Sequence, residues 1–250
     1  SLPKLRYLDL LGGWKRPPSG RKRIWHARRN VEMVAGILLR DVLRMPMRLL
    51  FTSAAQRHHT RFTKWLIGRM DAVVATSARS GAYLEVPHTV VMHGVDTDLF
   101  HPPVTDEDRF DTAGLAGKFA VGCTGRVRAQ KGTDLFVEAM IALLPHYPQW
   151  TAIITGRVTP EHEAFAAELR AQIEAAHLSD RILFLGEVDD VRLWYRRFTL
   201  FVAPSRNEGF GLTPLEAMAS STAAVTSDAG AYAEMIVSGK TGMVVAADDG

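Results

Sequence analysis

The stretch PSRNEGFGLTPLE, residues Pro204–Glu216, decides the fold of this chain, because it joins a strand to a helix through a glycine loop. The apolar run Leu200–Ala203 directly precedes it and is typical of a short buried strand. Pro214 fits the first turn of a helix, where its missing N–H is not needed. Gly209 and Gly211 allow the backbone between them to approach a ligand closely. A unit of this kind directs backbone N–H groups toward a ligand above the carboxyl end of a parallel sheet.

Two glutamates frame this glycine loop, and the sequence permits two roles for the second of them. Glu208 precedes the turn, where a carboxylate is poorly placed for packing, so we expect it to bind a ligand. Glu216 lies in the helix and is a second candidate for ligand binding. Thr213 and Glu216 also have the spacing of a capping box, in which the glutamate accepts a hydrogen bond from the Thr213 N–H. Both interpretations of Glu216 are open at this point.

Composition and length place the chain among globular proteins with room for one large domain or two smaller ones. It has 250 residues, of which 47% are hydrophobic. No apolar stretch approaches the length that a membrane-spanning helix needs. The single cysteine, Cys123, excludes an internal disulfide framework and fits a reducing compartment, so we expect a cytoplasmic location. Cys123 lies in an apolar run and is expected to pack in the core.

The formal net charge of +3 hides an asymmetry along the chain. Residues 1–100 contain 17 Lys and Arg against 7 Asp and Glu, whereas residues 101–250 contain 13 against 20. The basic first part indicates an anionic partner, such as nucleic acid, a phosphorylated saccharide or an acidic membrane surface. A solvated surface with long arginine side chains explains the charge equally well. No nucleic-acid-binding motif accompanies it, so we expect no nucleic-acid partner.

Short apolar runs alternate with amphipathic segments twice along the chain, which predicts two successive α/β units. Strands are expected at residues 24–26, 49–52, 71–76, 89–92, 119–123, 151–155, 182–185, 200–203, 223–226 and 243–245. Helices are expected after residue 30 and at residues 57–70, 134–144, 161–176, 191–198 and from 214 onward. Prolines and charges interrupt the pattern between residues 101 and 116. We therefore predict one domain over residues 1–104 and a second over residues 105–250.

A second glycine loop, GRVRAQKGT at residues 125–133, follows the strand predicted at residues 119–123. Arg126 and Lys131 lie in it, and the helix that follows contributes about half a positive charge at its N-terminus. The loop has neither the Walker pattern nor the Gly-x-Gly-x-x-Gly pattern of dinucleotide-binding proteins. Its cations suit a diphosphate, whereas Glu208 and Glu216 suit sugar hydroxyls. Together the two loops predict a nucleotide-sugar site.

At these residues the chain resembles the donor half of retaining glycosyltransferases of the two-Rossmann GT-B type, family four. The resemblance rests on Gly125–Gly132, on FLGEV at residues 184–188 and on Glu208–Glu216, and it covers roughly residues 70–250. HGVDTDLFHP, residues 93–102, is similar to the family's connector between domains. The family's opening strand and loop and its final helix have no counterpart here. The implied fold is two Rossmann-like domains, both incomplete in this chain: the C-terminal part of the acceptor-side domain (1–104) and the donor-binding domain without its last helices (105–250).

The resemblance implies a role for each matching residue. Glu208, Arg126 and Lys131 would be catalytic, with Glu208 holding the transferred sugar and the two cations holding the donor diphosphate. Glu216 would bind the ribose, Val188 would touch the base, and Arg157 would lie near the phosphates. The implied donor-binding residues are Arg126, Lys131, Arg157, Val188, Glu208, Gly209, Phe210, Gly211, Leu212 and Glu216.

Two segments in the first part of the chain narrow the expected substrate. WHARRN at residues 25–30 and TSAAQRH at residues 52–58 look like the lipopolysaccharide-core mannosyltransferase branch of the family. This implies GDP-mannose as donor and a saccharide or lipopolysaccharide-core glycolipid as acceptor. With the basic first part of the chain, we also expect peripheral contact with the anionic inner face of a membrane. Where the family often has a histidine that faces the reacting sugar, this chain has Ser53 and Ala54. His26, His58 and His59 are the nearest alternatives in this part of the chain.

The predicted reaction is transfer of a hexose with retention, without a metal or other cofactor. Asp96 and Asp98 form the alternative metal-binding pair, although they lie in the connector. A non-catalytic nucleotide-sugar-binding or membrane-associated module is the alternative to an enzyme.

Overall fold

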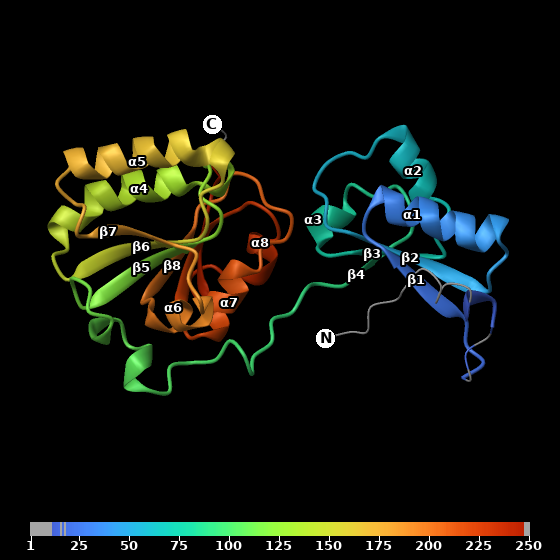
Figure 1. Cartoon of the computed structure of the whole chain (residues 1–250), viewed down its shortest axis with the longest axis horizontal. Coiled ribbons are helices and arrows are strands. Elements are labelled where there is room, and N and C mark those ends of the chain that lie inside the picture. Colours follow the sequence, from blue (N-terminus) through green and yellow to red (C-terminus); the bar gives the residue numbers. More distant parts are fainter. Residues whose placement is uncertain (1–11, 16, 18, 248–250) are drawn as a thin grey trace. The chain divides into compact units, whose positions relative to one another are not determined.

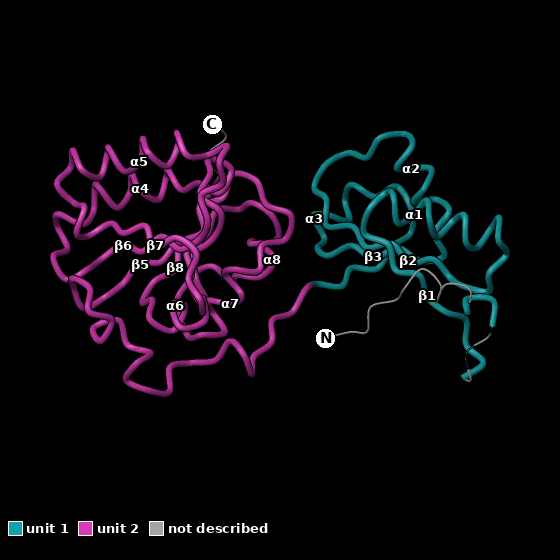
Figure 2. Tube along the Cα trace, in the orientation of Figure 1, with its two compact units in different colours: residues 1–92 teal, residues 93–250 magenta. Residues whose placement is uncertain are grey.

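The computed structural model describes residues 12–247 except residues 16 and 18. The chain divides into two compact units, Ser1–Met92 and His93–Gly250 (Figure 2). Each unit contains one parallel sheet with helices packed on it (Figure 1). The predicted α/β fold with two Rossmann-like parts is confirmed.

The first unit contains a four-stranded parallel sheet. Its strands are β1 (Arg23–Ala27), β2 (Met47–Ser53), β3 (Ala72–Ala75) and β4 (Thr89–Val90), in the spatial order β1-β2-β3-β4. Its helices are α1 (Asn30–Ile37), which continues as the π-helical turn η2 (Leu38–Val42), α2 (Arg61–Ile67) and α3 (Ala78–Gly81). Every second residue of β2 is buried, because alternate side chains of a strand point to the same face. Leu49 and Phe51 of β2 pack with Met33 of α1 and Leu66 of α2 in one core.

The second unit contains a six-stranded parallel sheet in the spatial order β10-β9-β8-β5-β6-β7. Its strands are β5 (Phe119–Thr124), β6 (Trp150–Thr155), β7 (Ile182–Gly186), β8 (Leu200–Ala203), β9 (Ala223–Ser227) and β10 (Gly242–Val245). Its α-helices are α4 (Thr133–Leu143), α5 (Glu163–Ala175), α6 (Val191–Arg197), α7 (Thr213–Ala219) and α8 (Tyr232–Met235). Short 3₁₀ turns are η3 (Asp106–Asp108), η4 (Phe110–Thr112), η5 (Ala129–Lys131), η6 (Leu144–His146) and η7 (Pro160–His162).

Helices cover both faces of this sheet, as a parallel sheet requires. α4 and α5 pack on one face, where Phe136 and Leu169 join Val121 of β5 in one core (Figure 1). α6, α7 and α8 pack on the other face, where Tyr195 and Tyr232 join residues of β5, β6 and β8 (Figure 1). Neighbouring residues of a strand therefore serve different cores.

The connector segment packs with the second unit, so the units divide earlier than the boundary predicted between residues 104 and 105. The division falls between Met92 and His93. The Phe100 ring lies 5.9 Å from the Tyr195 ring, and Asp108 forms a buried ion pair with Arg196 of α6. The prolines and charges of residues 101–116 indicated a linker. The sequence did not predict that Phe100 and Asp108 would pack against α6, because these contacts are tertiary.

Candidate functional site

The strand order of the second sheet reverses between β5 and β8. From β5 the chain runs outward through β6 and β7, and from β8 it runs outward through β9 and β10. β5 and β8 are direct neighbours, with Val121 paired to Leu200 and Gly122 paired to Phe201. Ligands of open parallel sheets bind where the order reverses, beyond the carboxyl ends of the strands. The two glycine loops predicted to form the site follow these two strands.

Backbone hydrogen bonds hold the two loops together. The N–H groups of Arg206 and Asn207 donate to the carbonyl oxygen of Gln130, at 3.0 and 3.3 Å. The Arg206 guanidinium donates to the carbonyl of Ala129 at 2.7 Å and to Asp134 Oδ1 at 2.8 Å. The loop after β8 is therefore fastened to the loop after β5 and to the first turn of α4.

Gly132 permits this close approach. Its φ of 69° lies in the left-handed region, which residues with a Cβ avoid. A Cβ on Gly132 would lie 1.9 Å from the carbonyl oxygen of Pro204, far inside any van der Waals contact. The glycine is therefore needed both for the backbone conformation and for the spacing of the two loops.

Lys131 and Glu208 meet at the centre of the site. The Lys131 Nζ forms an ion pair with Glu208 Oε2, and the two side chains are 21% and 16% exposed. Glu208 Oε2 lies 3.5 Å from the hydroxyl of Tyr232, and Glu208 Oε1 accepts a hydrogen bond from the Gly209 N–H at 3.1 Å. The cation of one loop and the carboxylate of the other thus share one place, as the sequence predicted for the two loops.

Glu216 does not take part in a capping box. The helix α7 is capped by Leu212, which places Thr213 at the first helical position and Pro214 in the first turn. Glu216 Oε2 instead accepts a hydrogen bond from the Tyr195 hydroxyl at 2.8 Å. The capping interpretation of Glu216 is therefore wrong, because its side chain turns toward α6 rather than back to the Thr213 N–H.

The other predicted site residues lie in loops at the same edge of the sheet. Arg126 follows β5 and Arg157 follows β6, and both side chains are exposed. The Val127 N–H donates to the Arg157 carbonyl at 3.1 Å, so these two loops also touch. Val188 follows β7 and is half-buried.

In the glycine loop after β8, Phe210 is buried and Leu212 is exposed. The Phe210 ring makes an edge-to-face contact with His93, with 4.8 Å between ring centroids and an angle of 87°. Gly211, at a φ of 86°, allows the loop to pass close to Tyr232, because a Cβ there would lie 2.2 Å from the tyrosine ring. His93 and Tyr232 were not predicted as site residues. His93 lies in the predicted connector and Tyr232 in an apolar segment, and neither position indicates a role in the site.

A small cavity of about 10 Å³ lies beneath the two loops, with room for about one water molecule. Arg126, Lys131, Ser205, Tyr232 and Cys123 are among the residues that line it. Burial raises the pKa of the Cys123 thiol to about 12, so this cysteine is a core residue, as predicted, and not a nucleophile. Burial also raises the pKa of the Tyr232 hydroxyl, with a further contribution from the negative charge of Glu208.

The first aspartate of the connector, Asp96, is used within its own turn. Asp96 Oδ1 accepts hydrogen bonds from the N–H groups of Asp98 and Leu99, at 3.0 and 3.3 Å. Within residues 12–247, where placement is described, no three histidine, cysteine, aspartate or glutamate side chains gather in a way that could hold a metal ion.

The three candidate histidines lie in the first unit, in different surroundings. His26 Nε2 lies 2.8 Å from the hydroxyl of Thr52, and the His58 ring packs edge-on against Tyr83. Burial lowers the pKa of His59, and nearby positive charges lower it further. Hydrogen bonding and packing account for His26 and His58.

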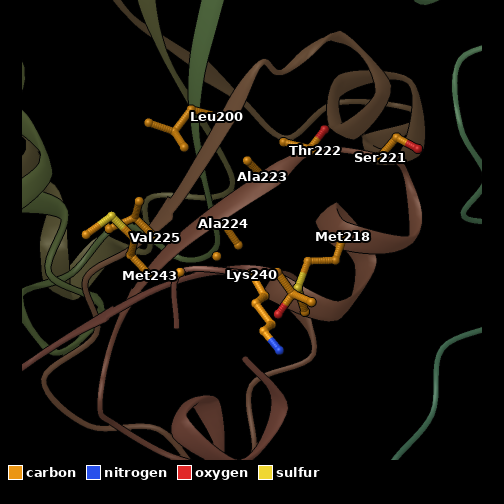
Figure 3. A pocket seen from close by; sticks show the side chains of 12 residues that line it. Leu200, Met218, Ser221, Thr222, Ala223, Ala224, Val225, Lys240 and Met243 are labelled. Carbon is orange, nitrogen blue, oxygen red and sulfur yellow. The ribbon is translucent and has the colours of Figure 1, made fainter. Parts of the chain in front are cut away.

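A wider hollow of about 740 Å³ lies at the opposite end of the second sheet (Figure 3). Leu200, Ala223 and Met243, at or near the amino ends of β8, β9 and β10, are among its mostly apolar lining residues. Lys240 is the charged residue of this lining. The polar residues of this lining are Ser221, Thr222, Lys240 and Thr241, and no residue of either glycine loop belongs to it.

No described helix is long and apolar enough to cross a membrane.

The chain shares its fold with solved glycosyltransferases. The Anabaena protein Alr3699/HepE in complex with UDP superposes with a TM-score of 0.80 over 90% of this chain and 65% of that chain, at 24% identity, which shows the shared GT-B fold. The C-terminal domain of a group 1 glycosyl transferase (LpcC) from Francisella tularensis is 39% identical, with a TM-score of 0.59 over 62% of this chain and 81% of that chain. The sequence pattern of glycosyl transferases group 1 matches residues 118–250, and the chain belongs to this family.

Two relatives resemble the chain over its whole length. The lipopolysaccharide core biosynthesis mannosyltransferase LpcC of Rhizobium leguminosarum bv. viciae is 69% identical across 100% of this chain and 71% of its own length. The lipopolysaccharide core biosynthesis mannosyltransferase LpsB of Rhizobium meliloti (strain 1021) is 56% identical across 100% of this chain and 72% of its own length. The resemblance drawn from the glycine loops is confirmed.

Proposed function

We propose that this glycosyltransferase moves mannose from GDP-mannose, with retention of anomeric configuration, to a saccharide acceptor of the lipopolysaccharide core. The observation that carries the proposal is the meeting of Lys131 and Glu208 where the sheet reverses its strand order. Mannose and the lipopolysaccharide core are proposed because both relatives that match the whole of this chain are named for that activity.

Lys131 and Arg126 serve the leaving diphosphate in this proposal. Cleavage of the bond to the sugar leaves negative charge on the diphosphate, and the sugar gains oxocarbenium character. Two cations and the N-terminus of α4, which follows the loop after β5, supply positive charge before the reaction begins. Arg157, in the loop after β6, adds a third cation in this proposal.

Glu208 and Glu216 serve the hydroxyl groups of the donor. Glu208 holds the transferred sugar, together with backbone N–H groups of Phe210, Gly211 and Leu212, and Gly209 gives the loop its close approach. Glu216, deeper in α7, binds the ribose, and Val188 touches the base. Lys131 forms an ion pair with Glu208, so the diphosphate does not meet an uncompensated carboxylate.

The reaction is proposed to need no metal or other cofactor. The positive charge that a metal would bring is supplied by side chains of the loop after β5. Asp96 is engaged by its own turn, which favours a structural role for that aspartate. Activity only in added Mn²⁺ would instead assign the metal role to Asp96 and Asp98.

A site-directed test compares Lys131→Ala and Glu208→Gln with Lys240→Ala, a lysine in the distant hollow. Losing one preorganised donor of positive charge costs about 3 kcal/mol, or roughly a hundredfold in rate. We expect each of the first two variants to lose at least that much transfer from GDP-mannose to a lipopolysaccharide-core acceptor, and Lys240→Ala to keep its rate. NMR of the product reports the anomeric configuration. Near-normal turnover of Lys131→Ala or Glu208→Gln in folded protein contradicts the proposal.

The non-catalytic alternative predicts binding without turnover. Calorimetry with GDP and UDP, followed by a transfer assay with several nucleotide-sugars, distinguishes the two. Tight GDP binding with no transfer to any core acceptor would support the binding module.

We also propose peripheral contact with an anionic membrane on the cytoplasmic side, through α2. Phe62 and Trp65 of α2 are both more than half exposed, and their rings stack 6.2 Å apart. The Arg69 guanidinium lies 5.8 Å from the Trp65 ring centroid. Exposed aromatic rings beside cationic side chains suit the interface of an anionic bilayer.

Vesicle sedimentation tests this contact. We expect binding to phosphatidylcholine vesicles that contain phosphatidylglycerol, no binding to phosphatidylcholine alone, and loss of binding in a Phe62→Ala, Trp65→Ala double variant. Tyr147→Ala removes an exposed aromatic ring from the second unit and serves as the control. Equal binding by the double variant would refute the assignment to α2.

A further inference from the structure

Tyr195 of α6 is a buried tyrosine with its hydroxyl on a site carboxylate. Its side chain is fully buried, and its hydroxyl donates to Glu216 Oε2 at 2.8 Å. Tyr195 lies in α6, whereas the two glycine loops lead into α4 and α7. No sequence motif predicts a role for it in the site. A buried hydroxyl must find a partner, and this one finds the carboxylate for which we propose ribose binding.

Contacts on three sides hold Tyr195 in place. The next residue, Arg196, forms a buried ion pair with Asp108 at 2.5 Å. The Thr222 hydroxyl lies 2.6 Å from the Tyr195 carbonyl oxygen, and the Phe100 ring lies 5.9 Å from the Tyr195 ring. The tyrosine is therefore fixed by the connector and by the segment after α7, independently of Glu216.

The hydrogen bond directs how Glu216 can act. An ionised carboxylate accepts hydrogen bonds at two oxygens, each with two lone pairs. The Tyr195 hydroxyl uses one lone pair of Oε2. The remaining lone pairs are available for two neighbouring hydroxyl groups, such as those of a ribose. Burial, together with the negative charge of Glu216, raises the pKa of the Tyr195 hydroxyl well above its usual value, so it remains a donor across the physiological range.

We propose that Tyr195 is a positioning residue: its hydroxyl fixes the Glu216 carboxylate in the orientation that takes the ribose hydroxyls of the donor nucleotide. The inference rests on the proposed role of Glu216. It predicts that Tyr195 governs discrimination between ribose and deoxyribose, although it lies beneath the carboxylate and touches no nucleotide itself.

The test measures discrimination rather than affinity alone. GDP, UDP and ADP are titrated by calorimetry, and the tightest is compared with its 2′-deoxy and 3′-deoxy forms. For the wild-type protein we expect the ribose form to bind at least tenfold more tightly than a deoxy form. In Tyr195→Phe, which keeps the ring and its packing, we expect the ribose form to weaken about tenfold while the deoxy form changes less than threefold, because a hydrogen bond to a charged group has been lost.

Two controls separate positioning from packing. Thr222→Val removes one of the three contacts that hold Tyr195 but keeps the other two and the hydroxyl on Glu216, so it should lower the melting temperature and leave discrimination unchanged. Tyr147→Phe removes an exposed hydroxyl elsewhere in the second unit and should change neither. If Tyr195→Phe behaves like Thr222→Val, with lower stability and intact discrimination, the positioning role is overturned.

Glu216→Gln distinguishes failure of the inference from failure of the proposed function. If Glu216→Gln loses discrimination and Tyr195→Phe keeps it, only the role of Tyr195 is wrong. If wild-type protein binds none of the three nucleotides, or Glu216→Gln discriminates as well as wild type, the role of Glu216 fails and the inference fails with it. If the proposed roles of Glu216 and Tyr195 both hold, the effects of Glu216→Gln and Tyr195→Phe on discrimination will not add in the double variant, because both act through the Glu216 carboxylate.

Discussion

Gly132→Ala tests whether the close contact between the two glycine loops builds the site. Gly132 has a φ of 69°, and a Cβ there would lie 1.9 Å from the Pro204 carbonyl oxygen. Gly239 provides a matched control in the same unit, since its φ is 78° and a Cβ there would meet nothing within 4 Å. Both alanine substitutions impose the same left-handed backbone, but only one also forces the loops apart.

The expected losses of stability and of transfer rate follow from the surroundings of Gly132 and Gly239. A residue with a Cβ in the left-handed region costs about 1–2 kcal/mol, which both variants incur. Ordinary contact begins at 3.4 Å, so the Gly132→Ala variant must separate the loops by about 1.5 Å from the contact at 1.9 Å. That separation acts between Lys131 and Glu208, and a misplacement of about 1 Å in a catalytic site can cost roughly a hundredfold in rate.

We therefore expect Gly239→Ala to lower the melting temperature by a few degrees with normal nucleotide binding and transfer. Gly132→Ala should lower the melting temperature at least as much and reduce transfer by about a hundredfold. Calorimetric unfolding, nucleotide titration and the mannose-transfer assay report the three quantities. Equal transfer rates for the two variants would refute the idea that loop spacing matters to the site.

Two further predictions concern stability and reactivity. Burial alone would raise the pKa of Asp108, but hydrogen bonds from the Val104 N–H and from Arg196 hold it well below its usual value. This carboxylate therefore stabilises the fold fully above its unfolded pKa of 3.8 and progressively less as the pH falls below that value. Urea unfolding should show Asp108→Asn to be about 3 kcal/mol less stable than wild type at pH 7, with a difference that shrinks in acid, and a pH-independent difference would contradict this. Because the pKa of Cys123 is raised to about 12, a thiol reagent at pH 8 should label it only after unfolding, and rapid labelling of the folded protein would show that the cysteine is accessible.

Local patterns were sufficient to predict most of the secondary structure and the two loops of the site. The strand Leu200–Ala203 was predicted with the observed bounds, because four apolar residues before a proline are typical of a buried strand. The helix of Pro214 and the pairing of a basic glycine loop with an acidic one were likewise evident. Short elements such as α3 and α8 were missed, because four residues are too few to show a helical period.

The aromatic partners of the site carboxylates and of the glycine loop could not be predicted. Glu216 had the spacing of a capping box with Thr213, and only the packing of α6 against α7 shows that Tyr195 takes the carboxylate instead. Tyr232 contacts Glu208 and His93 contacts Phe210 through tertiary packing as well. The sequence around these two residues predicts only that they pack within the fold. An aromatic residue at a buried helical position looks the same in sequence whether or not its polar atom serves a site.

The sequence by itself determined the alternation of strands and helices, the family, and which two loops contain the cations and carboxylates. These follow from periodicity, glycine and proline positions and short-range charge, all of which act over a few residues. The tertiary structure decided that β5 and β8 are neighbours, that Lys131 pairs with Glu208, and that a tyrosine stands behind Glu216. The physical reason is distance along the chain: these contacts join segments that only the packing of two helical layers on one sheet brings together.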